Sequence, residues 1–131
     1  ESLQIGKARI IREEGSQIVI LNFGALIEEA KSVASDFKAT LIDMRFVKPL
    51  DESVLKKFLS KSDIFISIED GSIMGGAGSA VQEFASKEKI NIKSILIGIP
   101  DKFIEHSSRE EMLEESGLNS DSIKSKLKEL L

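Results

Sequence analysis

Apolar positions along this sequence change repeatedly between short continuous runs and stretches with helical spacing. The continuous runs predict strands at residues 8–12, 17–22, 40–44, 64–68 and 92–97. Between them, apolar residues recur three and four positions apart, as they do from Leu26 to Phe37, and this spacing predicts helices. The predicted order of elements is β-β-α-β-α-β-α-β-α-α, where the last two helices cover residues 108–117 and the segment after 119–121.

Local signals mark where several of these elements begin or turn. Asp51 is a favourable N-cap residue, and Leu50 before it is placed to pack on Leu55 as a hydrophobic staple. Residues 108–111 match a capping box, and Gly117 is a stop signal for the helix that follows them. Gly15, in the turn after the first strand, is expected to supply a positive φ.

Alternating strands and helices predict an α/β fold, an open and mostly parallel sheet with helices on both faces. The first two strands are joined by only a few residues, too few for a parallel crossover, so the first strand is expected to be an antiparallel edge strand. In such sheets the crevice lies outside the carboxyl ends of the strands, where the strand order reverses. Two turns are candidates for this position: Phe23-Gly24 and the stretch from Glu69 to Gly78.

The stretch from Glu69 to Gly78 is acidic at its start and rich in glycine after it. It matches neither phosphate-binding motif: a dinucleotide fingerprint needs Gly or Ala where Val81 stands, and a P-loop needs Lys where Ala77 stands. A helix N-terminus with free amides is still able to hold an anion. We favour the simpler interpretation that glycine lets the turn bend and lets the helix and the sheet approach each other closely.

No complete set of catalytic or metal-binding residues is recognisable in the sequence. Glu69 and Asp70 are adjacent at a strand end and so point in different directions, which favours solvated or partner-facing carboxylates over an acid/base pair. His106 is the single histidine and is assigned a loop or capping role, while Asp43 and Arg45 are expected to form a structural pair. Ile73 and Met74 suit either an exposed protein interface or a buried loop anchor, and the sequence leaves both open.

Composition narrows the class of protein. The 131 residues correspond to a single domain, residues 1–131, and the net charge of -4 argues against non-specific binding to nucleic acid. There is no cysteine, which excludes disulfides and thiolate metal sites. No apolar run is long enough to cross a membrane and no signal peptide is visible. The expected location is the cytoplasm, or a plastid-type organelle if the source is eukaryotic. The chain begins at Glu1 and not at Met, from which we expect a processed product or, as we favour, a fragment of a longer chain.

Several stretches together resemble the carboxyl-terminal domain of the 1-deoxy-D-xylulose 5-phosphate synthase family. They are ILNFG at 20–24, LIDMRFVKPLD at 41–51, EDGSIMGGAGSAV at 69–81, IPDKFIEH at 99–106 and the tail at 111–123. The resemblance implies a transketolase C-terminal domain-like fold, a three-layer α/β/α sandwich around a five-strand mixed sheet whose first strand is antiparallel at the edge.

The resemblance also implies a function. Enzymes of that family are transferases that join pyruvate to glyceraldehyde 3-phosphate for isoprenoid, thiamine and pyridoxal synthesis. They use thiamine diphosphate and magnesium, which the two upstream domains hold. No catalytic, cofactor-binding or metal-binding residue of the family falls on this chain, and the domain is expected to pack on the upstream domains and support a homodimer. The residues expected to line this interface or crevice loop are Phe23, Gly24, Glu69, Asp70, Gly71, Ile73, Met74, Gly75, Gly76 and Gly78.

Two alternatives remain open from the sequence. One is the final domain of a 2-oxo acid dehydrogenase β-subunit, which docks an acyltransferase and shares a comparable Arg-x-x-x-Pro-Leu-Asp pattern at residues 45–51. The other is a free-standing anion- or nucleotide-binding module that uses the helix beginning near Gly76.

Overall fold

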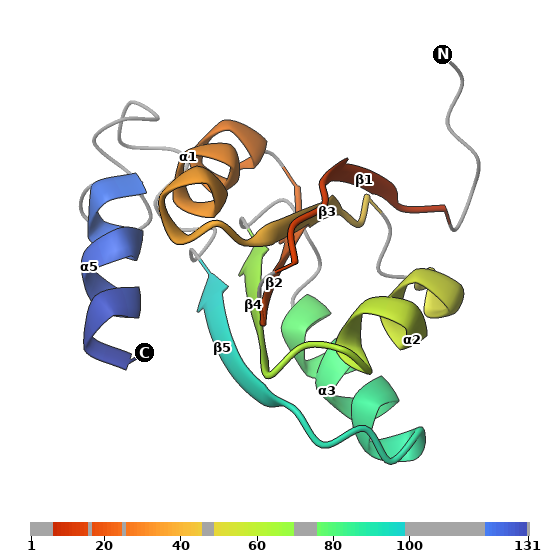
Figure 1. Cartoon of the computed structure of the whole chain (residues 1–131). Coiled ribbons are helices and arrows are strands. Elements are labelled where there is room, and N and C mark those ends of the chain that lie inside the picture. The colour runs from red at the N-terminus through yellow and green to blue at the C-terminus, as the bar shows by residue number, and fades with distance from the viewer. Residues whose placement is uncertain are drawn as a thin grey trace.

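The computed structural model describes residues 7–15, 17–24, 26–45, 49–69, 76–98 and 120–130 of the chain. Strands and helices alternate through most of this sequence (Figure 1). The elements are β1 (Arg9–Arg12), β2 (Ile18–Phe23), α1 (Ile27–Phe37), β3 (Thr40–Asp43), α2 (Glu52–Leu59), β4 (Ile64–Glu69), α3 (Ala77–Lys87), β5 (Lys93–Gly98) and α5 (Ser120–Leu130). The helix predicted at residues 108–117, like His106, lies outside the described residues.

The strands form one 5-stranded sheet in the order β1-β3-β2-β4-β5. β1 runs antiparallel to β3 at one edge, and all the other neighbouring strands are parallel. The predicted mixed sheet with an antiparallel first strand at the edge is therefore confirmed. The order has this form because the short turn after β1 cannot cross over the sheet, whereas α1, α2 and α3 each provide a crossover between parallel strands.

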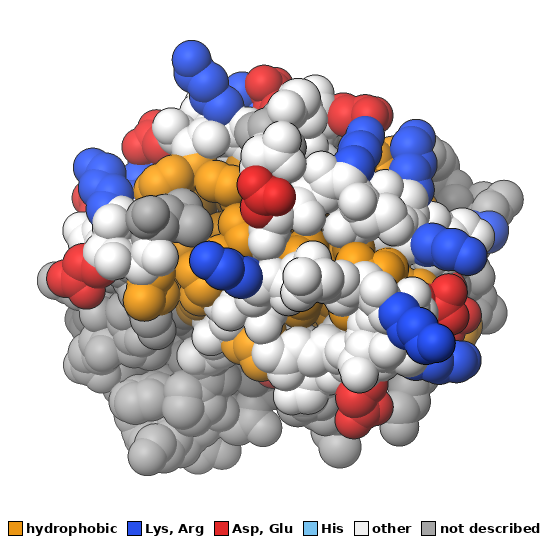
Figure 2. Space-filling model, turned by 60° about the horizontal axis from the view of Figure 1, so that its bottom comes forward, with side chains coloured by type: hydrophobic (Ala, Val, Ile, Leu, Met, Phe, Trp, Pro, Cys, Tyr) orange, Lys and Arg blue, Asp and Glu red, His pale blue; other side chains and the backbone are white. Residues whose placement is uncertain are grey.

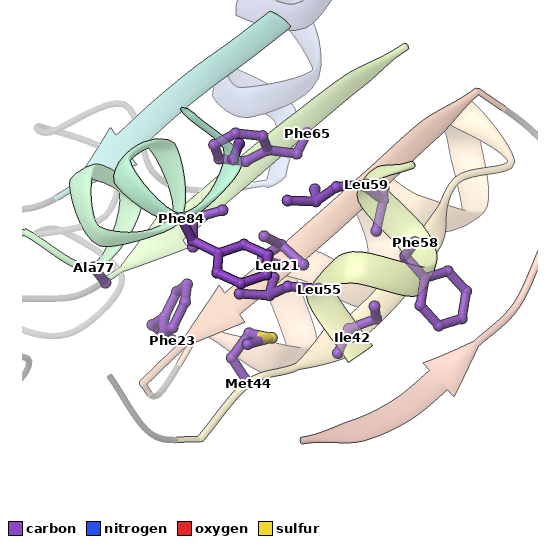
Figure 3. Packing of buried hydrophobic residues seen from close by; sticks show 13 residues of the cluster. Leu21, Phe23, Ile42, Met44, Leu55, Phe58, Leu59, Phe65, Ala77 and Phe84 are labelled. Carbon is purple, nitrogen blue, oxygen red and sulfur yellow. The ribbon is translucent and has the colours of Figure 1, made fainter. Parts of the chain in front are cut away.

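Helices cover both faces of the sheet, α1 and α5 on one side and α2 and α3 on the other (Figure 1). Because successive strand residues point to opposite faces, Ile20 of β2 belongs to the cluster under α1 and α5, and Leu21 to the cluster under α2 and α3. Figure 3 shows the second cluster, in which Leu55 of α2 and Phe84 of α3 pack with Leu21. The three layers of the predicted sandwich are thus present.

Caps and polar contacts hold individual helices in place. Asp51 caps α2 as predicted: its Oδ1 accepts a hydrogen bond from the backbone N–H of Val54 at 3.3 Å, and its Oδ2 accepts one from the N–H of Ala8 at 2.8 Å. α5 is tied to α1 by Lys124, whose Nζ lies 2.9 Å from both Asp36 Oδ2 and Ser32 Oγ. None of the helices in the described part of the chain has the length and apolar character needed to span a bilayer.

Candidate functional site at the carboxyl edge of the sheet

The strand order reverses between β2 and β4. The chain leaves β2 through α1 towards β3 on one side, and it leaves β4 through α3 towards β5 on the other. The carboxyl ends of the two strands are neighbours, with Phe23 paired to Glu69 in the parallel register. This is the switch point at which open α/β sheets form a crevice, and it is bordered by Phe23, Gly24 and Glu69, the described residues at which the two turns selected from the sequence begin.

Five of the residues expected at this crevice are described by the structure. Phe23 and Glu69 are the last residues of β2 and β4 rather than the first residues of turns, and Phe23 is fully buried beside Met44, Ala77 and Phe84 (Figure 3). Gly24 follows β2 with φ 102°. The remaining expected residues, Asp70, Gly71, Ile73, Met74 and Gly75, lie outside the described residues.

The side chain of Glu69 caps the N-terminus of α3. Gly76 occupies the N-cap position in the left-handed region, at φ 79°, and has no side chain with which to cap the helix. The Oε2 of Glu69 accepts a hydrogen bond at 3.2 Å from the backbone N–H of Gly78 in the first turn. A carboxylate at this end of a helix is stabilised by the helix dipole. It also fills the position that a bound anion would take.

Gly78 lies in the first turn of α3 and not in the preceding turn, and its backbone packs closely against the sheet. A Cβ atom on Gly78 would lie 2.5 Å from Ser67 Oγ on β4 and 2.7 Å from Leu96 Cδ2 on β5. A side chain here would require Ser67 and Leu96 to shift, or α3 to move away from the sheet. Gly76 for the bend and Gly78 for the close approach are the two uses of glycine that we favoured from the sequence. Gly15, in contrast, does not adopt the positive φ expected of it.

Asn22 is a buried polar residue at the switch point that the sequence analysis did not select. Its side-chain Nδ2 donates a hydrogen bond to the carbonyl oxygen of Gly24 at 3.2 Å. The backbone carbonyl oxygen of Asn22 accepts a hydrogen bond from the backbone N–H of Met44 at 2.9 Å. These bonds fix the turn after β2. The Oδ1 of Asn22 and the Oγ of Ser67 are buried without a partner in the described part of the chain. A single polar residue at the end of an apolar run was the signal that could have identified Asn22.

The expected pair between Asp43 and Arg45 is wrong for this structure. Both residues are half-buried at the end of β3, but no ion pair joins them within the described residues. Arg45 has φ 64°, a left-handed conformation that turns the chain immediately after the strand. Among the described residues, no group of three or more His, Cys, Asp or Glu side chains lies close enough together to hold a metal ion.

A family model described as "Transketolase, C-terminal domain" matches residues 6–123. The chain belongs to the transketolase C-terminal domain family. The resemblance found in the sequence is thereby confirmed.

Curated relatives of this transketolase C-terminal domain are named 1-deoxy-D-xylulose-5-phosphate synthase. The protein from Blochmanniella floridana is 49% identical over 90% of this chain and 19% of its own length. The protein from Hahella chejuensis is 43% identical over 100% of this chain and 20% of its own length, and that from Pseudoalteromonas translucida is 41% identical over 96% and 20%. This domain therefore spans about a fifth of the length of the curated relatives that it matches.

A solved structure has the same fold. It is titled as a split gene transketolase, inactive beta4 tetramer, and superposes with a TM-score of 0.80 over 97% of this chain and 43% of that chain. The sequence identity is 24%, so this likeness concerns the fold alone.

Proposed function

We propose that this chain is the carboxyl-terminal domain of a 1-deoxy-D-xylulose 5-phosphate synthase and serves a structural role within it. The observation that carries the proposal is the identity of 41–49% to relatives of that name, spread over nearly the whole chain. The complete protein is then a transferase that condenses pyruvate with glyceraldehyde 3-phosphate, with loss of carbon dioxide. Its product is a precursor for isoprenoid, thiamine and pyridoxal synthesis, and its location is the cytoplasm, as its bacterial relatives suggest.

The proposed enzyme uses thiamine diphosphate and magnesium, and the described residues of the crevice do not fit that cofactor. A diphosphate needs free donors or cations, but the amide of Gly78 already donates to the Glu69 carboxylate. A second anion at this end of α3 would meet that carboxylate at close range and be repelled. We therefore assign cofactor and metal binding to the upstream domains, and packing and support of a homodimer to this one.

The alternatives have weaker support. A free-standing anion- or nucleotide-binding module would need the N-terminus of α3, which Glu69 occupies. The final domain of a 2-oxo acid dehydrogenase β-subunit shares the fold class, but the curated relatives described above carry the synthase name at 41–49% identity.

The full-length protein tests the proposal through its activity and its cofactor affinity together. It is expected to form 1-deoxy-D-xylulose 5-phosphate from pyruvate and glyceraldehyde 3-phosphate, whereas the 131-residue chain alone is expected to be inactive. In the full-length protein, Gly76→Val forces a β-branched residue into φ 79°, a strain of about 1–3 kcal/mol in the packing of this domain. Gly15→Val is the matched control, because Gly15 also has open space around it but no positive φ.

Titration with thiamine diphosphate should give the same affinity for both variants, while Gly76→Val lowers the melting temperature or weakens the dimer. Lost cofactor affinity in an intact Gly76→Val dimer would contradict the structural role. Absence of synthase activity in the full-length wild-type protein would contradict the assignment itself.

A further inference from the structure

An uncharged groove lies between the second half of α3 and the start of β5. It encloses about 330 Å³, and all of the side chains that line it are uncharged, among them Gln82 and Ser86 of α3 and Ser94 of β5. Leu96 points to the same face as Ser94, and it is 40% exposed. Figure 2 shows the molecule with the lower side of Figure 1 turned forward. On this face, hydrophobic side chains (orange) are exposed between uncharged polar side chains and backbone (white), and most charged side chains lie towards the rim.

The two edge strands of the sheet differ in how well they are protected against pairing with a strand of another molecule. β1 has four residues, of which Arg9 and Arg12 are charged, and its pairing with β3 is irregular between Ile10 and Arg12. β5 has six residues with a regular register to β4, and within the described part of the chain it pairs with no other strand. Its single charge, Lys93, is at its first position. Charge and irregularity are the devices that keep an edge from pairing, and β5 has neither over its last five residues.

We infer that the outer edge of β5 and the α3–β5 groove form the contact surface for a second copy of this chain, with the two β5 strands antiparallel about a two-fold axis at Leu96. The inference rests on the homodimer in the proposed function and names its surface. In a two-fold interface each group near the axis meets its own copy, so a charged residue there would face an equal charge. A chain with a net charge of -4 is best joined to itself through a face without charge.

The residues of β5 suit this arrangement. Pairing centred on Leu96 places it opposite Leu96 of the second copy, Ile95 opposite Ile97, and Ser94 opposite Gly98. Each side chain then stays on the sheet face that it already occupies, because paired residues have the same parity in the strand. Ser94 lies opposite a residue without a side chain, and Lys93 remains outside these pairs. The hydroxyl and amide groups of the groove both donate and accept, so they are able to pair with their own copies.

Cross-linking of the full-length protein tests this register. In a cysteine-free full-length background, Leu96→Cys brings two thiols together at the axis. Opposite residues of antiparallel strands have Cα atoms about 4.5–5.5 Å apart, which is within the range for a disulfide. Mild oxidation should therefore give a covalent dimer on a non-reducing gel. Ile10→Cys is the matched control, since Ile10 is 41% exposed on the opposite edge strand, and it should stay uncross-linked.

Sedimentation gives a second measurement that does not depend on thiols. Leu96→Glu places two carboxylates at the axis and should weaken the dimer about tenfold or more, whereas Ile10→Glu should not. A dimer that neither cross-links through Leu96→Cys nor weakens with Leu96→Glu would overturn the inference. Failure of the proposed synthase activity in a protein that still cross-links would overturn only the proposed function.

Discussion

The close contact between α3 and β4 predicts a strong energetic coupling between Gly78 and Ser67. An added Cβ in Gly78→Ala lies 2.5 Å from Ser67 Oγ, well inside the normal contact distance, and β4 is a central strand that cannot move away. Overpacking of this kind costs about 1–3 kcal/mol. The better helix propensity of alanine returns up to about 1 kcal/mol. We therefore expect Gly78→Ala to lower the free energy of unfolding by about 1–2 kcal/mol.

Ser67→Ala removes the atom that the new methyl group would meet. The hydroxyl of Ser67 is buried and has no partner among the described residues, so its removal costs no hydrogen bond there. It should stabilise the fold by roughly 0.5–1 kcal/mol as the desolvation penalty disappears. In the double variant the methyl group still meets Leu96, but that side chain is 40% exposed and is able to turn away. We expect the double variant to be about as stable as the wild type or more so.

Urea unfolding of the four proteins measures this double-mutant cycle. The chain contains no Trp and no Tyr, so far-UV circular dichroism is the suitable signal. The expected coupling between the two sites is about 1–2 kcal/mol in favour of the double variant. Effects that add to within about 0.5 kcal/mol would refute the argument, since two sites in steric contact should not behave independently.

Two further predictions concern helix ends. Asp51→Ala removes the N-cap of α2 and the acceptor for the backbone N–H of Ala8, so it should lower the free energy of unfolding, measured in urea, by about 2 kcal/mol. A loss no larger than that of a substitution at an exposed position would show that Asp51 does not serve both hydrogen bonds. Lys38→Gly relieves a left-handed residue at φ 53° after α1 and should raise stability by about 0.5–1 kcal/mol, while Lys31→Gly inside α1 should lower it by about 1 kcal/mol. Equal effects of the two glycine substitutions would show that the left-handed geometry stores no strain.

Much of the fold follows from the sequence because its signals are local. The apolar runs of β2 and β4 and the helical spacing of α1 depend only on neighbouring residues, as does the Asp51 cap. The antiparallel edge position of β1 follows from one short turn. Apolar runs and one short connection were therefore enough to predict the five strands and the antiparallel edge position of β1, whereas the order β1-β3-β2-β4-β5 was not predicted.

The details of the crevice could not be read in the same way. The sequence places Glu69 and Gly78 in one glycine-rich stretch, but their hydrogen bond depends on how α3 docks on β4. The approach of Gly78 to Ser67 and Leu96 depends on three elements at once. The left-handed conformation of Arg45 directly after β3 was not predictable from the residue types, and no ion pair joins Asp43 and Arg45 among the described residues.

The two hydrophobic clusters differ in when a growing chain is able to complete them. The buried residues of the cluster under α2 and α3 lie between Val19 and Ala85, so all of them are synthesised before β5. The cluster under α1 and α5 requires Ile123 and Leu127 to cover strand residues such as Ile20. During synthesis one face of the sheet therefore stays bare for longer than the other. A translational stall between β5 and α5 would leave that apolar face exposed, and such a nascent chain should bind chaperones through the α1 side.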